Sequence, residues 1–590
     1  MRGEIISNLS LKEFISELDG RLEKLSHQEL KEIIRGHALN LAPRERGEYL
    51  DRFVHPKKPK GSRKSTELTM TDGEFLLREI EAFGKRAENY QYTTGWGWDD
   101  EYGEERAWGD DSWVSEIDSL FEGINDFYEA GDYALARKAY EKLFEIYLGG
   151  SEEGKFSGHD QDEMIETDLE ETGLKYLHSI YMSEKPLSRP EALLHGITNL
   201  SYLSREGTIH GVIDLSMDDL PELDQFGEQW IEYLKKQKED RIVTPLLKEA
   251  VRLFEGTKGL ETLALEKGHQ FPGAYVEWLE ALKKDKNYRE MIRVSRLGLE
   301  KLSDRLVIKA RIADYLHEAA NQLDQKDLIE ESLKEAVYAS PSLSRLLTLL
   351  DHAKTTEQKV DYLNGALARF TKIRKRTEKR DLLETDFNRS PDLYQNQVPE
   401  NLEVYSYLLK GDYSQATSIM SASKSLGWSS GGSPNAILVP FFLYVRWDHG
   451  KKLTTNIIEL WKDATDVPIS FGTYFQEDSV PGDLGKRFRL HLENVLKEFP
   501  IPEKERDEYF LAAEKAALKR VDAIVSEKHR QSYWKAGQLL LALAETYWSH
   551  GEANKGQKLL NRFKEKYNRH HAFKTELQKA ANKSKIFSVS

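Results

Sequence analysis

One short pattern recurs three times along this chain. In each copy a glycine is followed by an acidic residue, an aromatic residue precedes the glycine by four positions, and a small residue follows it by five. The copies are Phe127, Gly131 and Ala136; Tyr407, Gly411 and Ala416; and Tyr547, Gly551 and Gly556. The pattern predicts two helices joined by a tight turn. A single helix hairpin cannot bury its apolar face alone, so neighbouring hairpins must stack.

The spacing is that of a tetratricopeptide-type hairpin. The small residue lies where the two helices approach most closely, the aromatic residue fills the groove between them, and the glycine takes the positive φ of a helix end. The match is degenerate, because Leu143 and Phe563 stand where small residues are expected. The three copies also do not follow the tandem period of about 34 residues. We therefore predict an all-α protein, an irregular α-solenoid of tetratricopeptide-like hairpins with a small N-terminal helical cap.

The composition and the positions of Gly and Pro, which interrupt helices, suggest how the chain is divided into domains. We expect more than about 60% helix and almost no sheet, because helical periodicity dominates and no clear period-2 alternation marks a strand. The predicted divisions are a helical cap at 1–54, a basic flexible linker at 55–71, a helical domain with a Trp-rich acidic segment and the first hairpin at 72–259, a helical-repeat domain at 260–426, a loop at 427–435, and a C-terminal helical domain with the last hairpin at 436–590.

The overall charge and the absence of cysteine exclude several classes of site. The net charge is −15, which disfavours nucleic acid as a partner because phosphate contacts require clustered Lys and Arg. With no cysteine, disulfides, thiol nucleophiles and cysteine-ligated zinc are all excluded. We read no signal peptide and no apolar run long enough to span a membrane. We therefore expect a cytoplasmic protein without a membrane partner.

Residues 90–113 combine aromatic and acidic side chains in an unusual density. Seven aromatic residues, among them Trp96, Trp98 and Trp108, alternate with carboxylates such as Asp99 and Asp100. Repeated glycines exclude a regular helix here. Two interpretations stay open. The tryptophans could pack inward and fasten the segment to the first hairpin, or they could form a partner-binding edge whose carboxylates steer a basic ligand.

Two stretches resemble uncharacterised bacterial helical-repeat proteins. The first runs from Trp98 to Tyr147, where the acidic Trp segment leads into a Gly-Asp-Tyr-x-x-Ala hairpin. The second is carried by Tyr533, Ala536, Leu539 to Glu545 and Phe573-x-x-Glu576-Leu577. Similar tails accompany SWIM zinc fingers in some bacterial proteins. Those fingers need cysteine ligands, so the resemblance implies helical repeats here and no zinc site.

No catalytic, cofactor or metal site is predicted. His159, Asp160, Asp162 and Glu163 cluster in sequence, but their spacing fits no metal-ligand template, and a solvated acidic loop explains them. The Gly- and Ser-rich stretch Gly427 to Ser433 lacks the Gly-Lys-Ser/Thr ending of a phosphate-binding loop. We therefore do not expect an enzyme.

The leading functional interpretation is a protein-interaction scaffold that offers a helical-repeat surface to another protein or a peptide. The alternative is a regulated effector or protease substrate in a bacterial stress, CRISPR or phage-defence system. It draws on a likeness in size and layout to the helical substrate of CRISPR-associated proteases. Its candidate processing loop, Met420 to Pro434, contains Met420, Lys424 and Trp428. Composition predicts that this loop and His55 to Met70 are the first sites of limited proteolysis.

Overall fold

A computed structural model covers most of the helical part of the chain. It describes residues 21, 24, 25, 31, 70–99, 104–158, 161–200, 208–215, 220–377, 391–428, 433–466, 481–584 and 586–587. Of these residues 75% are helical, and the sheet consists of one two-stranded hairpin. The predicted all-α class is confirmed. Nearly all of the N-terminal cap and of the basic linker lies outside the described residues, and the predicted domain boundaries stay predictions.

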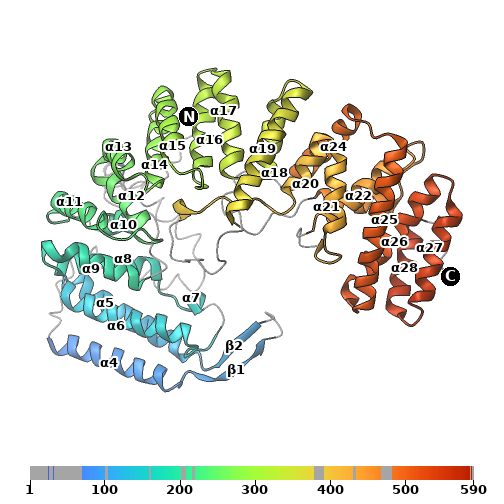
Figure 1. Cartoon of the computed structure of the whole chain (residues 1–590). Helices are drawn as coiled ribbons and strands as arrows, with labels where there is room; N and C mark the ends of the chain where they lie inside the picture. Colours follow the sequence, from blue (N-terminus) through green and yellow to red (C-terminus); the bar gives the residue numbers. More distant parts are fainter. Residues whose placement is uncertain are drawn as a thin grey trace. The chain divides into compact units, whose positions relative to one another are not determined.

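The chain divides into two compact units, Met1–Glu277 with Asn388–Pro391, and Trp278–Phe387 with Asp392–Ser590. In the first unit most successive helices pack on their neighbours in the chain (Figure 1). Its elements are α4 (Met70–Glu88), β1 (Thr93–Asp99), β2 (Glu104–Gly109), α5 (Ser112–Glu129), α6 (Tyr133–Glu152), α7 (Gln161–Met164), α8 (Leu169–Ser183), the 3-10 helix Pro186–Ser188, α9 (Arg189–Asn199), α10 (Thr208–Asp214), α11 (Leu223–Leu234), α12 (Val243–Phe254) and α13 (Gly256–Lys267).

The boundary between the units falls within α14 (Gly273–Lys284). The second unit begins with the same serial packing, in which α15, α16, α17 and α18 contact one another in turn. Its elements are α15 (Tyr288–Lys301), α16 (Lys309–Gln322), α17 (Lys326–Ala339), α18 (Leu343–His352), α19 (Thr356–Thr377), the 3-10 helix Pro391–Leu393, α20 (Leu402–Lys410), α21 (Tyr413–Ala422), α22 (Asn435–Arg446), α23 (Thr455–Thr465), α24 (Pro481–Glu498), α25 (Glu503–Ser526), the 3-10 helix Arg530–Ser532, α26 (Tyr533–Ser549), α27 (Ala553–Lys566) and α28 (His571–Ser584).

The three repeat copies form the helix hairpins α5–α6, α20–α21 and α26–α27. The backbone φ is 83° at Gly131, 75° at Gly411 and 78° at Gly551, as the turn requires. Ala136 and Ala416 are fully buried, and a Cβ at Gly556 would lie 2.7 Å from the Ala544 carbonyl oxygen. The predicted positive φ of the glycine and the close approach at the small residue are confirmed.

The acidic residue after the turn has a role that the sequence pattern did not reveal. The side chain of Asp132 accepts a hydrogen bond from the backbone N–H of Leu135 at 3.1 Å, and Asp412 accepts one from Gln415 at 3.3 Å. Each aspartate therefore caps the second helix of its hairpin. Glu552 makes no such capping bond.

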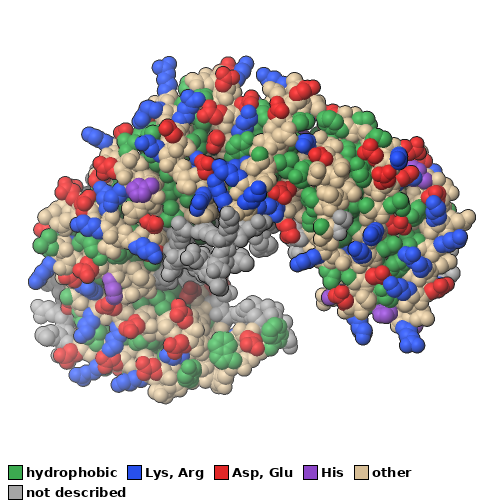
Figure 2. All heavy atoms as spheres, viewed as in Figure 1, with side chains coloured by type: hydrophobic (Ala, Val, Ile, Leu, Met, Phe, Trp, Pro, Cys, Tyr) green, Lys and Arg blue, Asp and Glu red, His purple; other side chains and the backbone are tan. Residues whose placement is uncertain are grey.

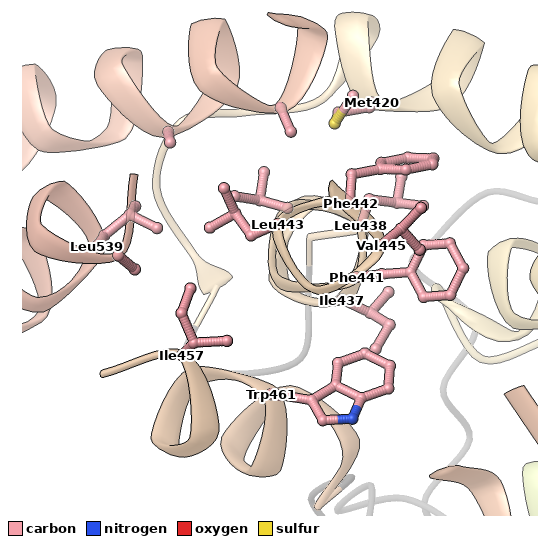
Figure 3. Packing of buried hydrophobic residues seen from close by; sticks show 14 of the residues in the cluster. Met420, Ile437, Leu438, Phe441, Phe442, Leu443, Val445, Ile457, Trp461 and Leu539 are labelled. Atoms are coloured by element: carbon pink, nitrogen blue, oxygen red, sulfur yellow. The ribbon is translucent and has the colours of Figure 1, made fainter. Parts of the chain in front are cut away.

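Helix α22 lies at the centre of the core of the second unit. Its residues are apolar around almost the whole circumference, which is the pattern of a fully buried helix. It contacts α21, α23, α25 and α26. Figure 3 shows Met420, Ile457, Trp461 and Leu539 pointing toward it from neighbouring helices. Because α22 has neighbours on several sides, this region is a layered core as well as a serial stack.

Candidate functional site

The Trp-rich tract forms an antiparallel hairpin of β1 and β2, beside the C-terminal end of α6 (Figure 1). In the register of this hairpin, Trp96 pairs with Ala107 and Trp98 pairs with Glu105, with a bulge between Thr93 and Gly95. The repeated glycines of this stretch predicted only that it is not a regular helix. The finding of two strands corrects the expectation of no strand here.

An aromatic cluster fastens the base of the hairpin to the helices. Trp113 is fully buried, and its ring centroid lies 4.9 Å from that of Phe156. The Phe156 ring also lies against Phe83 and Tyr92, at 5.7 and 6.0 Å. The Nε1–H of Trp113 donates a hydrogen bond to Ser157 Oγ at 3.2 Å. The hairpin is thereby held on a rigid base.

A polar contact strengthens the same base. The Tyr92 hydroxyl donates a hydrogen bond to Glu116 Oε2 at 2.5 Å and accepts one from Arg86 Nε at 3.0 Å. Arg86 also forms an ion pair with Glu116. These groups connect α4, the start of the tract and α5. The hydrogen bonds fix the point at which the chain leaves α4 and enters β1.

The three tryptophans of the strands are exposed. The exposed fractions are 63% for Trp96, 60% for Trp98 and 40% for Trp108. Figure 2 shows hydrophobic side chains at the surface over this hairpin. The packing interpretation is therefore correct for Trp113 and wrong for these three residues. Their exposure leaves a large apolar surface on a small, fixed element.

The two faces of the hairpin carry different aromatic groups. Trp96 and Trp98 are two residues apart and share one face. A Cβ at Gly154 would lie 2.0 Å from the Trp96 ring, so the indole rests against that glycine. Trp108 lies on the other face over Gly97, and the Arg106 guanidinium stacks on its ring at 3.8 Å from the centroid. The Arg106–Trp108 stack shows within this chain that such an indole face accepts a cation.

The predicted steering carboxylates belong, in the sequence, to the end of β1 and the residues that follow it. Asp99 is the last residue of β1, while Asp100 is outside the described residues. In the sequence, five of the seven residues from Asp99 to Glu105 are acidic. The stretch that joins β1 to β2 is therefore strongly acidic in the sequence.

The candidate processing loop is anchored at two of its three predicted residues. Met420 lies in α21 and is buried in the core. Trp428 is half-buried, with the Arg520 guanidinium stacked on its ring at 4.3 Å. Lys424 is exposed. Its carbonyl oxygen accepts a hydrogen bond from Trp428 Nε1 at 3.4 Å. Of the three residues, Lys424 has the accessible side chain.

The His159 to Glu163 cluster is only partly described. His159 and Asp160 lie outside the described residues, whereas Asp162 and Glu163 are in the short helix α7. Asp162 accepts a hydrogen bond from the Tyr147 hydroxyl at 2.5 Å. Within the part of the chain that the structure describes, no group of three or more His, Asp or Glu side chains could hold a metal ion.

A pocket of about 190 Å³ opens at the third repeat hairpin. Its lining includes Arg446, Asp507, Tyr547, His550, Glu552 and Lys555. The charges pair within it, because Arg446 Nε lies 2.6 Å from an Asp507 oxygen and Lys555 Nζ lies 2.8 Å from Glu552. With both cations compensated by carboxylates of the pocket itself, its chemistry selects no class of ligand.

Several buried polar residues join helices through hydrogen bonds, and the sequence did not reveal that they meet. Glu545 is fully buried in α26 and accepts hydrogen bonds from Thr454 Oγ1 at 2.5 Å and Asn456 Nδ2 at 2.7 Å. Asn456 Nδ2 also donates to the Ala580 carbonyl at 3.1 Å. The network connects α23, α26 and α28. Nothing in the linear spacing of these residues signals that they meet.

The comparisons with known proteins leave the family open. No protein-family model matches the chain, and no curated protein does either. Among solved structures, one match is a circular tandem repeat protein with novel repeat topology and enhanced subunit contact surfaces. It is 11% identical, and the match covers 88% of this chain and 92% of that chain with a TM-score of 0.16. Similarity at this level carries no argument about function. The resemblance to bacterial proteins with SWIM fingers stays a prediction.

A final structural property concerns membranes. Within the described residues, no helix combines the length and the apolar character that crossing a membrane requires.

Proposed function

We propose that the protein is a non-catalytic interaction scaffold, and that the β1–β2 hairpin is where a protein or peptide partner docks. The observation that carries the proposal is the exposure of Trp96, Trp98 and Trp108 on a hairpin whose base is firmly packed. Exposed tryptophan carries a risk of association. At interfaces, however, tryptophan is among the residues that contribute most to binding energy.

The rigidity of the base matters for affinity. Trp113 and the Tyr92–Glu116 contact hold the hairpin in place before any partner arrives. A pre-organised site loses little conformational entropy on binding. The stacked helices of α4, α5 and α6 then serve as the support of the site.

The charge of the hairpin indicates the chemistry of the partner. The carboxylates between Asp99 and Glu105 would attract a basic surface and accelerate its approach. Tryptophan faces also favour Lys and Arg through cation–π contacts. The proposed partner is therefore a basic protein or peptide, with Trp96, Trp98 and Trp108 as anchors and Asp99 and Asp100 as steering charges.

The test compares two sets of substitutions in affinity capture from cells that express the chain. We expect the W96A/W98A double variant to lose the partner that the parent protein captures. Since these side chains are exposed, the double variant should change the free energy of unfolding by no more than about 1 kcal/mol. The control is W534A, because Trp534 is an exposed tryptophan of α26, distant in sequence. Retention of the same partner by the double variant would contradict the proposal.

A buried tryptophan provides the opposite control. W113A should lower the free energy of unfolding by about 3–5 kcal/mol, the usual range for removing a buried aromatic side chain. Melting curves of the three variants would separate loss of binding from loss of folding.

The effector alternative is less well supported by the contacts of its loop. Cleavage beside Met420 would require a core side chain to leave α21, and cleavage beside Trp428 would require the Arg520 stack to open. Lys424 is the one predicted position whose side chain needs no rearrangement to reach a protease.

A further inference from the structure

We infer that the outer edge of β1 takes up an extended, Lys- or Arg-rich segment of a partner protein as a third strand of the sheet. This inference rests on the proposed function, because it names how the partner of the hairpin docks. Its basis is the direction in which the backbone groups of β1 point.

The two edges of the hairpin differ. The outer edge of β2 is covered at one point, where the backbone N–H of Gly158 donates to the Ala107 carbonyl at 3.1 Å and an isolated bridge forms. Among the described residues, no strand or bridge pairs with the outer edge of β1. That edge is therefore available for pairing.

The Gly158 contact also fixes which groups of β1 face outward. Because the Ala107 carbonyl points away from β1, Ala107 and Trp96 form a non-hydrogen-bonded pair of the antiparallel ladder. The N–H and C=O groups of Trp96 therefore point away from β2. Pairs alternate along the ladder, so those of Trp98 do the same. The residues with exposed indoles are thus also the residues with outward backbone groups.

The sequence of β1 does not protect this edge. Natural edge strands are usually protected by Lys, Pro or an inward charge. β1 reads Thr-Thr-Gly-Trp-Gly-Trp-Asp, and its bulge lies at the start, before Trp96. Gly95 and Gly97 carry no side chain, so a second backbone can approach closely. An extended peptide that adds to such an edge gains main-chain hydrogen bonds and side-chain contacts together.

Charge decides between possible occupants. A strand added beside β1 would direct every second side chain toward the face of Trp96 and Trp98. A Lys or Arg there would meet an indole, as Arg106 does on Trp108. It would also lie near Glu105, which pairs with Trp98 on the same face and is exposed. The β1 strand of a second copy contains no Lys or Arg and ends in Asp99, so the occupant we commit to is a basic segment of another protein.

The experiment uses the full chain and a labelled peptide of alternating lysine and threonine, with binding measured by fluorescence anisotropy. Two variants at one position isolate the backbone edge. W96A and W96P both remove the indole, but W96P also removes the outward N–H. Proline is tolerated on an edge strand where its nitrogen faces solvent. We expect W96P to bind about 2- to 13-fold more weakly than W96A, because one backbone hydrogen bond contributes roughly 0.5–1.5 kcal/mol and about 1.4 kcal/mol corresponds to tenfold in affinity.

A second measurement keeps the test valid if W96P does not fold. The same peptide N-methylated at every residue has no backbone N–H on either edge and cannot form a ladder with β1. We expect its affinity for the parent protein to fall by about tenfold or more, since several main-chain bonds are lost. A peptide in which glutamate replaces lysine should not bind, and salt should weaken the lysine peptide.

The results that would overturn pairing at the edge of β1 differ from those that would overturn the scaffold proposal. Failure of the lysine peptide to bind, equal binding of the N-methylated peptide, or binding of the glutamate peptide would each overturn the edge model. Self-association of the chain that W96P abolishes would also overturn it, by making a second copy the occupant. The scaffold proposal would survive these results if W96A/W98A still loses the captured partner.

Discussion

Because Gly411 has no side chain, the tight turn between α20 and α21 can form. The backbone φ of 75° is unfavourable for residues with a Cβ, and a Cβ there would also lie 2.9 Å from the Phe499 side chain.

His178 is constrained by burial instead of by backbone conformation. It is buried between α5, α6 and α8, where its Nδ1 lies 3.0 Å from the Tyr128 hydroxyl and its ring meets Tyr133 edge-on at 5.4 Å. Burial lowers the pKa of His178 to about 4.

This histidine predicts a dependence of stability on pH. An unfolded histidine has a pKa of about 6.5, so between pH 6.5 and 4 the unfolded chain binds more protons than the folded one. The contribution is fully present above pH 6.5 and is lost as the pH falls toward 4. Between pH 7 and pH 5 the loss should be about 2 kcal/mol.

The measurement is urea unfolding at both pH values for the parent chain and for H178Q. The variant should show a smaller difference between pH 7 and pH 5, because its side chain does not titrate. Since burial also lowers the pKa of His317 and His449, the quantity to compare is the change caused by the substitution. An identical pH dependence in both proteins would contradict the assignment to His178.

At the scale of elements, the helix hairpins were predictable and the β-hairpin was not. The glycine, the aromatic residue and Ala136 occupy fixed offsets because helix geometry repeats, so a local pattern is sufficient. The alternation Gly95-Trp96-Gly97-Trp98 has the period of a strand. However, glycine is depleted in strands and obscured the signal. That Trp113 is buried while Trp98 is exposed depends on Phe156 and Phe83, which are distant in sequence.

The first helix hairpin provides a direct test of close packing. A136L should lower the free energy of unfolding by about 1–3 kcal/mol, because a larger side chain overpacks the contact between α5 and α6. The matched control is A134L in the same helix, where the side chain is exposed. That substitution should change stability by less than about 0.5 kcal/mol. Equal effects of the two in thermal unfolding would show that the helices do not meet at Ala136.

At the scale of the whole molecule, the serial packing was predictable and the layered core was not. Repeat hairpins in sequence order imply neighbours in space, as α15 to α18 confirm. The contacts of α22 with α25 and α26 join segments with other helices between them. No periodicity encodes such pairings. The buried Glu545 network was missed for the same reason, since its partners come from three helices.

The order of protease cuts along the chain tests the candidate processing loop. Trypsin should cut within His55 to Met70, which is rich in Lys and Arg, before it cuts after Lys424. The reason is that Met420 and Trp428 anchor the chain on both sides of Lys424. W428A should accelerate the second cut, whereas W534A should not. Fragments identified by mass spectrometry over time would show the order, and a first cut at Lys424 in the parent chain would favour the effector alternative.

The position of α22 also has a consequence for synthesis on the ribosome. A chain emerges from its N-terminus, and the serially packed helices can find their partners soon after they appear. Helix α22 emerges with its apolar surface uncovered, and its contacts with α25 and α26 become possible only when residues up to Ser549 have been made. During that interval the most hydrophobic helix of the second unit is exposed. We expect a chaperone to contact the nascent chain at this stage.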